Sequence, residues 1–286
     1  MSKHKTKSSF SKELRDHIKK DKAAFAVYTF LRLCVIGVMI RSAFINRWES
    51  VFTCFLCLLL FLVPSFIERK FKVNIPTALE IVAYVFAFCA EILGEIGCYY
   101  VKYPFWDTML HTINGFMFAA FGFCLVDIFN RHKKLTFELS PAFLAIVSFC
   151  FSMTIGVLWE FFEFGADMFL HTDMQKDYFI SAFNTVSLDP DAANKAIGIK
   201  DIISTELITA SGAVSYSGYL DIGLIDTMKD LIVNFVGAVI FCMLGYVYVK
   251  HRGKGRIASS FIPVIEGDGN KTESDASKTP KDEASL

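Results

Sequence analysis

The amino-acid sequence predicts an all-α, polytopic membrane bundle of about six transmembrane helices with both termini in the cytoplasm. Hydrophobic residues make up 53% of the 286 residues, and 30 residues are phenylalanine. Apolar runs of about 20 residues recur, the length that a helix needs to cross roughly 30 Å of hydrocarbon. These runs are continuous rather than alternating, which argues against a membrane β-barrel. The net charge is zero, so composition gives no indication of a nucleic-acid partner.

The apolar segments divide the chain into a basic arm, a membrane bundle and a polar tail. The arm comprises residues 1–22 and the tail residues 257–286, and the tail has too little apolar surface to order itself. The bundle comprises residues 23–250, with an outer loop or cap at 164–230. Residues 194–210 are predicted to form a short amphipathic helix, and the 164–230 segment is either a cap over the outer face or a floppy insertion. The six predicted spans lie near 23–44, 49–67, 76–97, 108–129, 141–163 and 231–249.

The distribution of lysine and arginine predicts how the helices are oriented. Basic residues gather in alternate connections, which therefore lie on one side of the membrane, and the positive-inside rule makes that side the cytoplasm. The opposite loops carry little more than Arg47 and Lys102. Tryptophan is enriched at membrane interfaces, and all three tryptophans fall at the predicted outer interface. We therefore expect a multi-pass protein of the cytoplasmic membrane. The basic connections are 1–22, 68–72, 131–134 and 250–256, and the tryptophans are Trp48, Trp106 and Trp159.

The cysteine pattern gives no sign of a metal or redox centre. Eight cysteines occur singly, mostly inside apolar runs, and the single CxxC pair, Cys54 and Cys57, lies within a Phe/Leu-rich segment. A buried free cysteine behaves as a small hydrophobic residue, so we interpret these thiols as packing groups.

Ionisable residues at the outer ends of four helices are the strongest functional signal. Each helix carries a pair spaced by three or four residues, which places the pair on one helix face. A charged group in the hydrocarbon region costs roughly 2.5–3.5 kcal/mol, so such groups normally face the bundle interior. Solvation at the interface is the alternative for any one pair. The four pairs are Glu91 with Glu95, Asp107 with His111, Glu160 with Glu163, and Asp226 with Asp230.

Carboxylates gathered at one level need a counter-charge, because like charges raise one another's pKa. A divalent cation, Mg²⁺, Mn²⁺ or Zn²⁺, would supply it, and oxygen ligands with one imidazole suit these ions. Protonated carboxyls acting as a proton relay, or pairing with Arg41, are the alternatives. The candidate metal ligands are Asp107, His111, Glu160, Glu163, Asp226 and Asp230.

His111 has two interpretations, a neutral hydrogen-bonded residue or a ligand and general base. Asp107, one turn earlier, would orient the ring and fix its tautomer, which both functional roles require. We therefore take His111, Asp107 and Glu160 as candidate catalytic residues. The candidate substrate-binding residues are Arg41, Glu91, Glu95, Asn114 and Asn234.

Three sequence runs carry a resemblance to known families. PFWDTMLHTINGF (104–116), LWEFFEF (158–164) and DTMKDLIVNFVGAVI (226–240) resemble uncharacterised bacterial inner-membrane proteins of the YjdF type, and more distantly the VanZ-like family. Those families share an Asp-x-x-x-His helix start, a later helix-end Glu, and a final Asp-x-x-x-Asn-x-x-Gly helix. The resemblance covers segments three to six, and the long 164–230 insertion departs from the compact VanZ-like pattern. It implies a bacterial cell-envelope protein, with VanZ suggesting glycopeptide or outer-surface lipid chemistry.

Three functions fit these observations. The leading hypothesis is a metal-assisted enzyme or binding protein that acts on a lipid or another envelope amphiphile at an outer-leaflet site. A small proton- or cation-coupled transporter is the second, although the acidic residues lie at one surface rather than at the midplane, where carriers bind substrate. A non-catalytic accessory or resistance protein, whose polar residues fix helix packing, is the third.

Overall fold

The computed structural model describes residues 22–71, 73–131, 139–251 and 264–265. Within these residues, six helices are long and apolar enough to cross a membrane, which confirms the predicted class of polytopic helical membrane protein. The predicted arm (1–22) and tail (257–286) lie outside the described residues, apart from residues 22 and 264–265. The six spans are Lys22–Phe44, Trp48–Lys70, Thr77–Ile96, Trp106–Val126, Pro141–Leu170 and Leu224–Lys250.

Contacts divide the chain into two compact units, Met1–Met153 with Asn234–Leu286, and Thr154–Val233. Both boundaries fall inside continuous helices, α8 (Pro141–Leu170) and α9 (Leu224–Lys250). The first unit holds the other membrane helices, and the second holds the ends of α8 and α9 that flank an extramembrane β segment.

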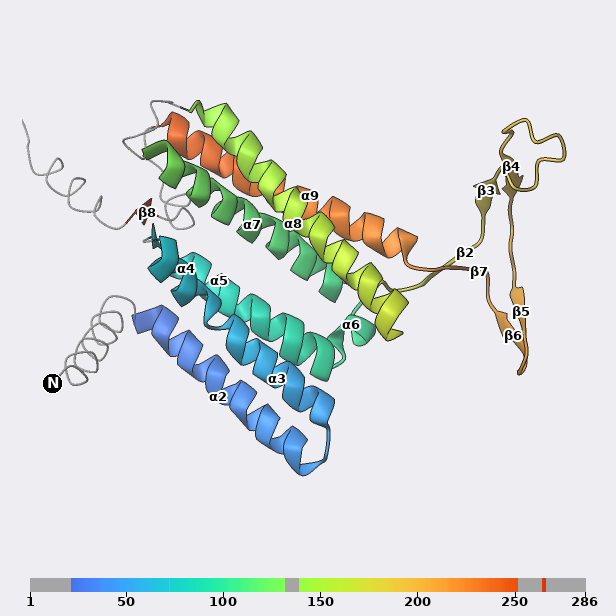
Figure 1. The fold of residues 1–286 in the computed structure, drawn as a ribbon, viewed down its shortest axis with the longest axis horizontal. Coiled ribbons are helices and arrows are strands. Elements are labelled where there is room, and N and C mark those ends of the chain that lie inside the picture. The colour runs from blue at the N-terminus through green and yellow to red at the C-terminus, as the bar shows by residue number, and fades with distance from the viewer. Residues whose placement is uncertain (1–21, 72, 132–138, 252–263, 266–286) are drawn as a thin grey trace, which may run out of the picture. The chain divides into compact units, whose positions relative to one another are not determined.

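In the first unit, helices α2, α3 and α5 lie side by side (Figure 1). Their shared core is aromatic, since the rings of Tyr28 and Phe61 both pack against Tyr84, with centroids 5.1 and 5.7 Å away. Cys54 and Cys57 are fully buried in the same core, as predicted for packing thiols. The elements are α2 (Lys22–Phe44), α3 (Trp48–Leu60), α4 (Val63–Phe71), β1 (Val73–Asn74, paired with β8, Val264–Ile265) and α5 (Thr77–Phe88).

The third span changes its winding where α5 ends. Residues Cys89–Ile96 form a π-helix, η1, in which the amide of Gly97 bonds to the carbonyl of Ile92, five residues earlier. Ile92 is buried in the same core cluster as Tyr84 and Ala87. In a regular α-helix, five residues turn through about 500°, so Ala87 and Ile92 would lie roughly 140° apart. The wider π turn brings them to one face.

A second core forms where α7 (Trp106–Arg131) packs against α9. Small residues line this contact, because Ala119, Ala120 and Ala238 are fully buried and allow the helices to approach closely. Phe241 packs edge-on against Phe123, with ring centroids 6.0 Å apart. The short helix α6 (Tyr99–Lys102) precedes α7.

The second unit contains three antiparallel two-stranded ribbons between α8 and α9. Tyr178 pairs with Asp221 in the ribbon next to the helices. The predicted helix at 194–210 is wrong, because the segment contains strands instead. Its isoleucines are β-branched and alternate with Gly198 and Lys200, a pattern that favours a strand. The ribbons are β2 (Tyr178–Ile180) with β7 (Tyr219–Asp221), β3 (Phe183–Thr185) with β4 (Ile197–Ile199), and β5 (Thr205–Thr209) with β6 (Gly212–Tyr216).

Two predicted span ends need correction. Helix α9 begins at Leu224 rather than near 231, and α8 continues to Leu170 rather than ending near 163. The predicted ends were placed where polar residues become frequent. In the structure these polar residues occupy one buried face of a helix that continues past them, since Asp226, Asp230 and Glu163 are all buried.

Candidate metal centre on helices α7 and α9

The backbones of α7 and α9 touch at two glycines. A Cβ atom added to Gly115 would lie 2.0 Å from the carbonyl oxygen of Asn234, and one added to Gly237 would lie 2.0 Å from the carbonyl oxygen of Thr112. No side chain fits at either position. Ser152, on α8, donates a hydrogen bond of 2.7 Å to the carbonyl of Gly115. The crossing point is therefore fixed by backbone contact rather than by large side chains.

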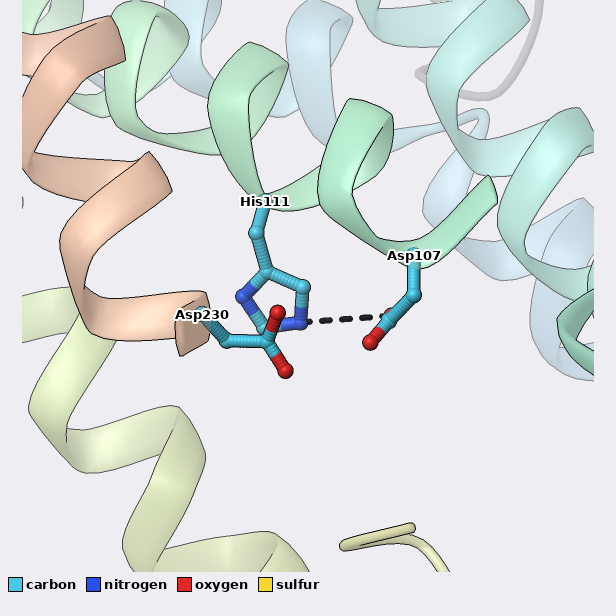
Figure 2. Close-up of side chains that lie close together, drawn as sticks. All are labelled: Asp107, His111 and Asp230. Atoms are coloured by element: carbon cyan, nitrogen blue, oxygen red, sulfur yellow. Dashed lines mark ion pairs between the residues drawn. The ribbon is translucent and has the colours of Figure 1, made fainter. Parts of the chain in front are cut away.

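Ionisable side chains lie one or two helical turns from this crossing. On α7, His111 precedes Gly115 by four residues, and Asp107 precedes His111 by four more. On α9, Asp230 precedes Asn234 by four. Residues four apart lie on the same helix face, so Asp107 and His111 share the face of Gly115, and Asp230 shares the face of Asn234. The two helices thus bring an imidazole and two carboxylates together (Figure 2).

The geometry of this group suits a metal ion. The Nε2 atom of His111 lies 3.5 Å from Oδ1 of Asp107, and one potential ligand atom from each of Asp107, His111 and Asp230 lies within 4.8 Å of the others. Ligand atoms about 2.1 Å from one ion would lie roughly 3–4.2 Å apart, so small side-chain movements suffice. His111 is 8% exposed and Asp230 is 1% exposed, whereas Asp107 is half-buried.

The ligand set narrows the choice of ion. Two carboxylates with one imidazole combine hard oxygen and borderline nitrogen donors, which favours Zn²⁺ or Mn²⁺ over Ca²⁺. Three protein ligands leave at least one coordination position for water or substrate, as in catalytic zinc sites. Asp107 would also orient the His111 ring if the imidazole acted as a general base.

Two asparagines stabilise the helices beside this group. Asn234 is 1% exposed, and its Oδ1 atom accepts a hydrogen bond of 3.4 Å from Nδ2 of Asn114 on α7. Its own Nδ2 atom lies 3.6 Å from the sulfur of Met153 on α8. Sequence reasoning assigned both asparagines to substrate binding. Their observed contacts are with protein groups, and the substrate role stays a prediction.

Other predicted ligands do not join the three-residue group in the described part of the chain. Glu163 is buried, and its Oε1 atom accepts a hydrogen bond of 2.9 Å from the indole of Trp159. Asp226 is 3% exposed and accepts the backbone N–H of Lys176 at 2.8 Å. Glu160 is 4% exposed on α8. Their roles as ligands or catalysts stay predictions.

The remaining predicted site residues lie on other helices. Glu91 and Glu95 belong to η1, where Glu91 is half-buried and Glu95 is exposed. Arg41 is exposed in the last turn of α2. None of these residues is part of the group on α7 and α9.

Residues 174–176, called the strap below, connect the end of α8 to the start of α9 through hydrogen bonds. The carboxylate of Asp167 accepts the backbone N–H groups of Met174 and Gln175 at 2.7 and 2.8 Å. The Gln175 side chain donates to Thr227 Oγ1 at 2.5 Å, and Lys176 N–H donates to Asp226 as described above. The strap explains why Asp226 is buried with a backbone partner.

Sequence reasoning missed Lys229, which follows Met228 on α9 and immediately precedes Asp230. Its Nζ atom lies 2.9 Å from the hydroxyl of Tyr178 on β2 and 5.6 Å from the centroid of that ring. A lysine in the run DTMKDLIVNF was a usable signal, since a cation inside an apolar helix is uncommon.

Comparison with known proteins identifies the family. Residues 27–251 match the model of a family described as "Predicted membrane protein (DUF2238)". The chain belongs to this family. An uncharacterized protein of Thermotoga maritima is 27% identical over 107 residues, which cover 37% of this chain and 53% of the relative. The chain therefore spans about half the length of that relative. No solved structure matches. Family membership confirms the predicted membrane class and adds no activity.

Proposed function

We propose that the chain is a cell-membrane protein that binds a divalent cation through Asp107, His111 and Asp230 and acts with it on an oxygen atom of an amphiphile in the outer leaflet. The observation that carries this proposal is the convergence of one ligand atom from each of the three residues within 4.8 Å. Two of the three residues, His111 and Asp230, are buried.

Electrostatics support a cation rather than a purely structural cluster. Two ionised carboxylates next to each other repel, and burying them without a counter-charge costs several kcal/mol. A divalent cation cancels both charges and uses the imidazole as a third ligand. Asp107 and His111 come from one helix and Asp230 from another, so the glycine crossing sets the width of the site.

The protein's own residues would orient the ion and the substrate. A bound Zn²⁺ or Mn²⁺ would act as a Lewis acid on a phosphoryl or carbonyl oxygen at the open coordination position. Asp107 holds the plane of the His111 ring. Asn114 and Asn234 keep α7 and α9 in register beside it. Glu160, buried on α8, is the candidate to exchange a proton with the substrate.

The location at the outer face of a bacterial cytoplasmic membrane is part of the proposal. It is supported by the segregation of lysine and arginine into alternate connections. The likeness of three sequence runs to YjdF-type and VanZ-like proteins also supports a role in the cell envelope. An oxygen-bearing lipid or glycolipid is the kind of molecule that such a site meets.

The test measures metal binding by the full-length protein in detergent, by titration with Zn²⁺ and Mn²⁺. We expect His111→Asn and Asp230→Asn to weaken binding at least about tenfold, since each removes a ligand. His171→Asn and Asp173→Asn are matched controls, because both residues are exposed outside the spans. His171 has a φ of 58°, which asparagine tolerates. Equal binding by all four variants and the wild type would remove the metal and favour an accessory role without turnover.

A further inference from the structure

A lysine separates the candidate metal centre from the lipid-facing side of α9. Lys229 is next to Asp230 in sequence, so the two side chains point about 100° apart around the helix. Asp230 is buried with His111, whereas Lys229 is half-buried and contacts Tyr178. Lys229 donates a hydrogen bond to the hydroxyl of Tyr178, and the charges of Asp230 and Asp226 on the same helix act on its ammonium. An ammonium has three donors, so Lys229 can still donate to an acceptor at the edge of the candidate metal centre.

Apolar side chains extend from this lysine along α9. A depression of about 470 Å³ is lined by Leu224, Ile225, Met228, Lys229, Ile232 and Val233. From the depression onward along α9, exposed apolar residues recur every three or four positions, which places them on one helix face. From Ile232 to Val247 the helix rises about 22 Å, more than the roughly 15 Å of one leaflet's hydrocarbon. The exposed residues are Ile225, Met228, Ile232, Val236, Ile240, Met243 and Val247.

The charges define the head group that this arrangement would accept. A divalent cation bound by Asp107 and Asp230 and the ammonium of Lys229 would be two positive groups next to each other, with Asp226 as the further carboxylate whose charge acts on Lys229. A phosphate group suits such a pair, because its oxygens bind both an ammonium and a hard or borderline metal ion. The hydroxyl of Tyr178, 2.9 Å from Nζ of Lys229, supplies a further hydrogen-bond donor.

We infer that the substrate of the site is an amphiphile with a phosphate head group, whose phosphate binds beside Lys229 and Tyr178 and whose acyl chain lies along the exposed apolar face of α9. This inference rests on the proposed function and adds the chemical class of the substrate. It requires one face of α9 to hold the ligand and the adjacent face to hold the metal.

The experiment measures binding of fluorescent phosphatidic acid to the full-length protein in a sugar-headed detergent, which itself carries no phosphate. Diacylglycerol with the same chains and inorganic phosphate are the comparison ligands. We expect Lys229→Gln to weaken phosphatidic-acid binding about tenfold or more, since it removes a charge-assisted hydrogen bond. Lys229→Arg keeps the charge and should bind within a few-fold of wild type. Lys200→Gln, at an exposed lysine outside the spans, is the matched control and should have no effect.

Each outcome decides the inference. Equal affinity for phosphatidic acid and diacylglycerol, or an unchanged affinity in Lys229→Gln, would overturn it and leave the face of α9 as ordinary lipid contact. An equal loss in Lys200→Gln would also overturn it, because the effect would then be general charge attraction. Binding of inorganic phosphate as tight as that of the lipid would assign the site to a soluble anion.

Failure of the inference and failure of the proposed function remain separate results. Lys229→Gln should bind Zn²⁺ and Mn²⁺ at least as tightly as wild type, because Lys229 is not a metal ligand and the variant loses a positive charge next to Asp230. A wild-type protein that binds phosphatidic acid through Lys229 but binds no metal would contradict the proposed function alone. A protein that binds metal but does not distinguish the two lipids would contradict the inference alone.

Discussion

At the scale of single residues, two aspartates on one helix show how neighbours determine a role. Asp226 and Asp230 are one turn apart on α9, and both are buried. Asp226 accepts a backbone N–H from Lys176, so its charge is stabilised within the protein. Asp230 instead lies with His111 and Asp107. The same side chain thus serves as an anchor for the strap in one case and as a candidate ligand in the other.

A third aspartate, Asp189, organises a loop outside the spans. Its carboxylate accepts the backbone N–H groups of Lys195, Ala193 and Asp191 at 3.0, 2.8 and 3.3 Å. These hydrogen bonds, that from Lys195 foremost, lower the pKa of Asp189. A carboxylate that accepts several backbone donors is stabilised in its ionised form. The carboxylate of Asp189 therefore fixes the backbone of residues 189–195.

Replacement of Asp189 should open this loop. We expect Asp189→Ala to increase amide hydrogen exchange of Ala193 and Lys195 at neutral pH while the helices keep their protection, measured by mass spectrometry. Because the pKa is lower in the folded loop, the stabilisation is present above the unfolded value of about 3.9. It is lost as the pH falls through the folded pKa. Asp191→Asn is the control, and faster exchange in that variant as well would contradict a specific role of Asp189.

At the scale of elements, the contact between α7 and α9 depends on the absence of two side chains. We expect Gly115→Ala and Gly237→Ala to separate the helices, since each added Cβ would overlap a backbone oxygen at 2.0 Å. Overpacking of this kind destabilises proteins by roughly 1–3 kcal/mol. The thermal unfolding midpoint in detergent should fall, and affinity for Zn²⁺ should fall with it, because the same contact sets the distance from His111 to Asp230.

Two other glycines provide matched controls for that prediction. Gly37 on α2 and Gly165 on α8 are also helical, but a Cβ at either position would meet nothing within 4 Å. Alanine there should leave the midpoint and the metal affinity unchanged, or raise the midpoint slightly through higher helix propensity. If all four alanine variants behave alike, the α7–α9 contact does not determine the site.

The sequence predicted the spans well because hydropathy over about 20 residues is a strong signal. It predicted the pairing of Asp107 with His111, since residues four apart on a helix share a face. It could not show that Asp230 is the residue that forms a three-residue group with them, because that depends on where α7 and α9 cross. The glycines at 115 and 237 were a clue to close helix packing, but only the folded backbone shows that each glycine faces the other helix.

The errors were in elements where local pattern is ambiguous. The strands β4 and β5 were expected as a helix because isoleucines cluster within 194–210, and short apolar runs fit both structures. The π-helix η1 has no sequence signature that hydropathy detects. The hydrogen bond from Lys176 to Asp226 joins positions 50 residues apart in sequence, so no short window of the chain contains both residues.

At the scale of the whole molecule, the predicted orientation places the connection between the third and fourth spans outside the cell. Cys98 lies in this connection and is exposed. Cys150 is also exposed, but it lies inside the α8 span, where a water-soluble reagent would not reach it, and Cys54, Cys57, Cys124 and Cys242 are buried. We expect a membrane-impermeant maleimide to label intact cells at Cys98. Cys98→Ser should abolish that labelling, and permeabilised cells should give the same extent as intact ones. Labelling that appears only after permeabilisation would invert the proposed orientation and place the metal site at the cytoplasmic face.

The π-helix described in the third span has a consequence for how this molecule tolerates change in chain length. A segment wound with five residues per hydrogen-bonded turn holds one residue more than an α-helical turn of similar height. Loss of one residue between Cys89 and Ile92 would let the segment rewind as α-helix, and this isoleucine would then follow Ala87 by four positions, on the same helix face. The span could therefore shorten by one residue and still place the isoleucine in the aromatic core.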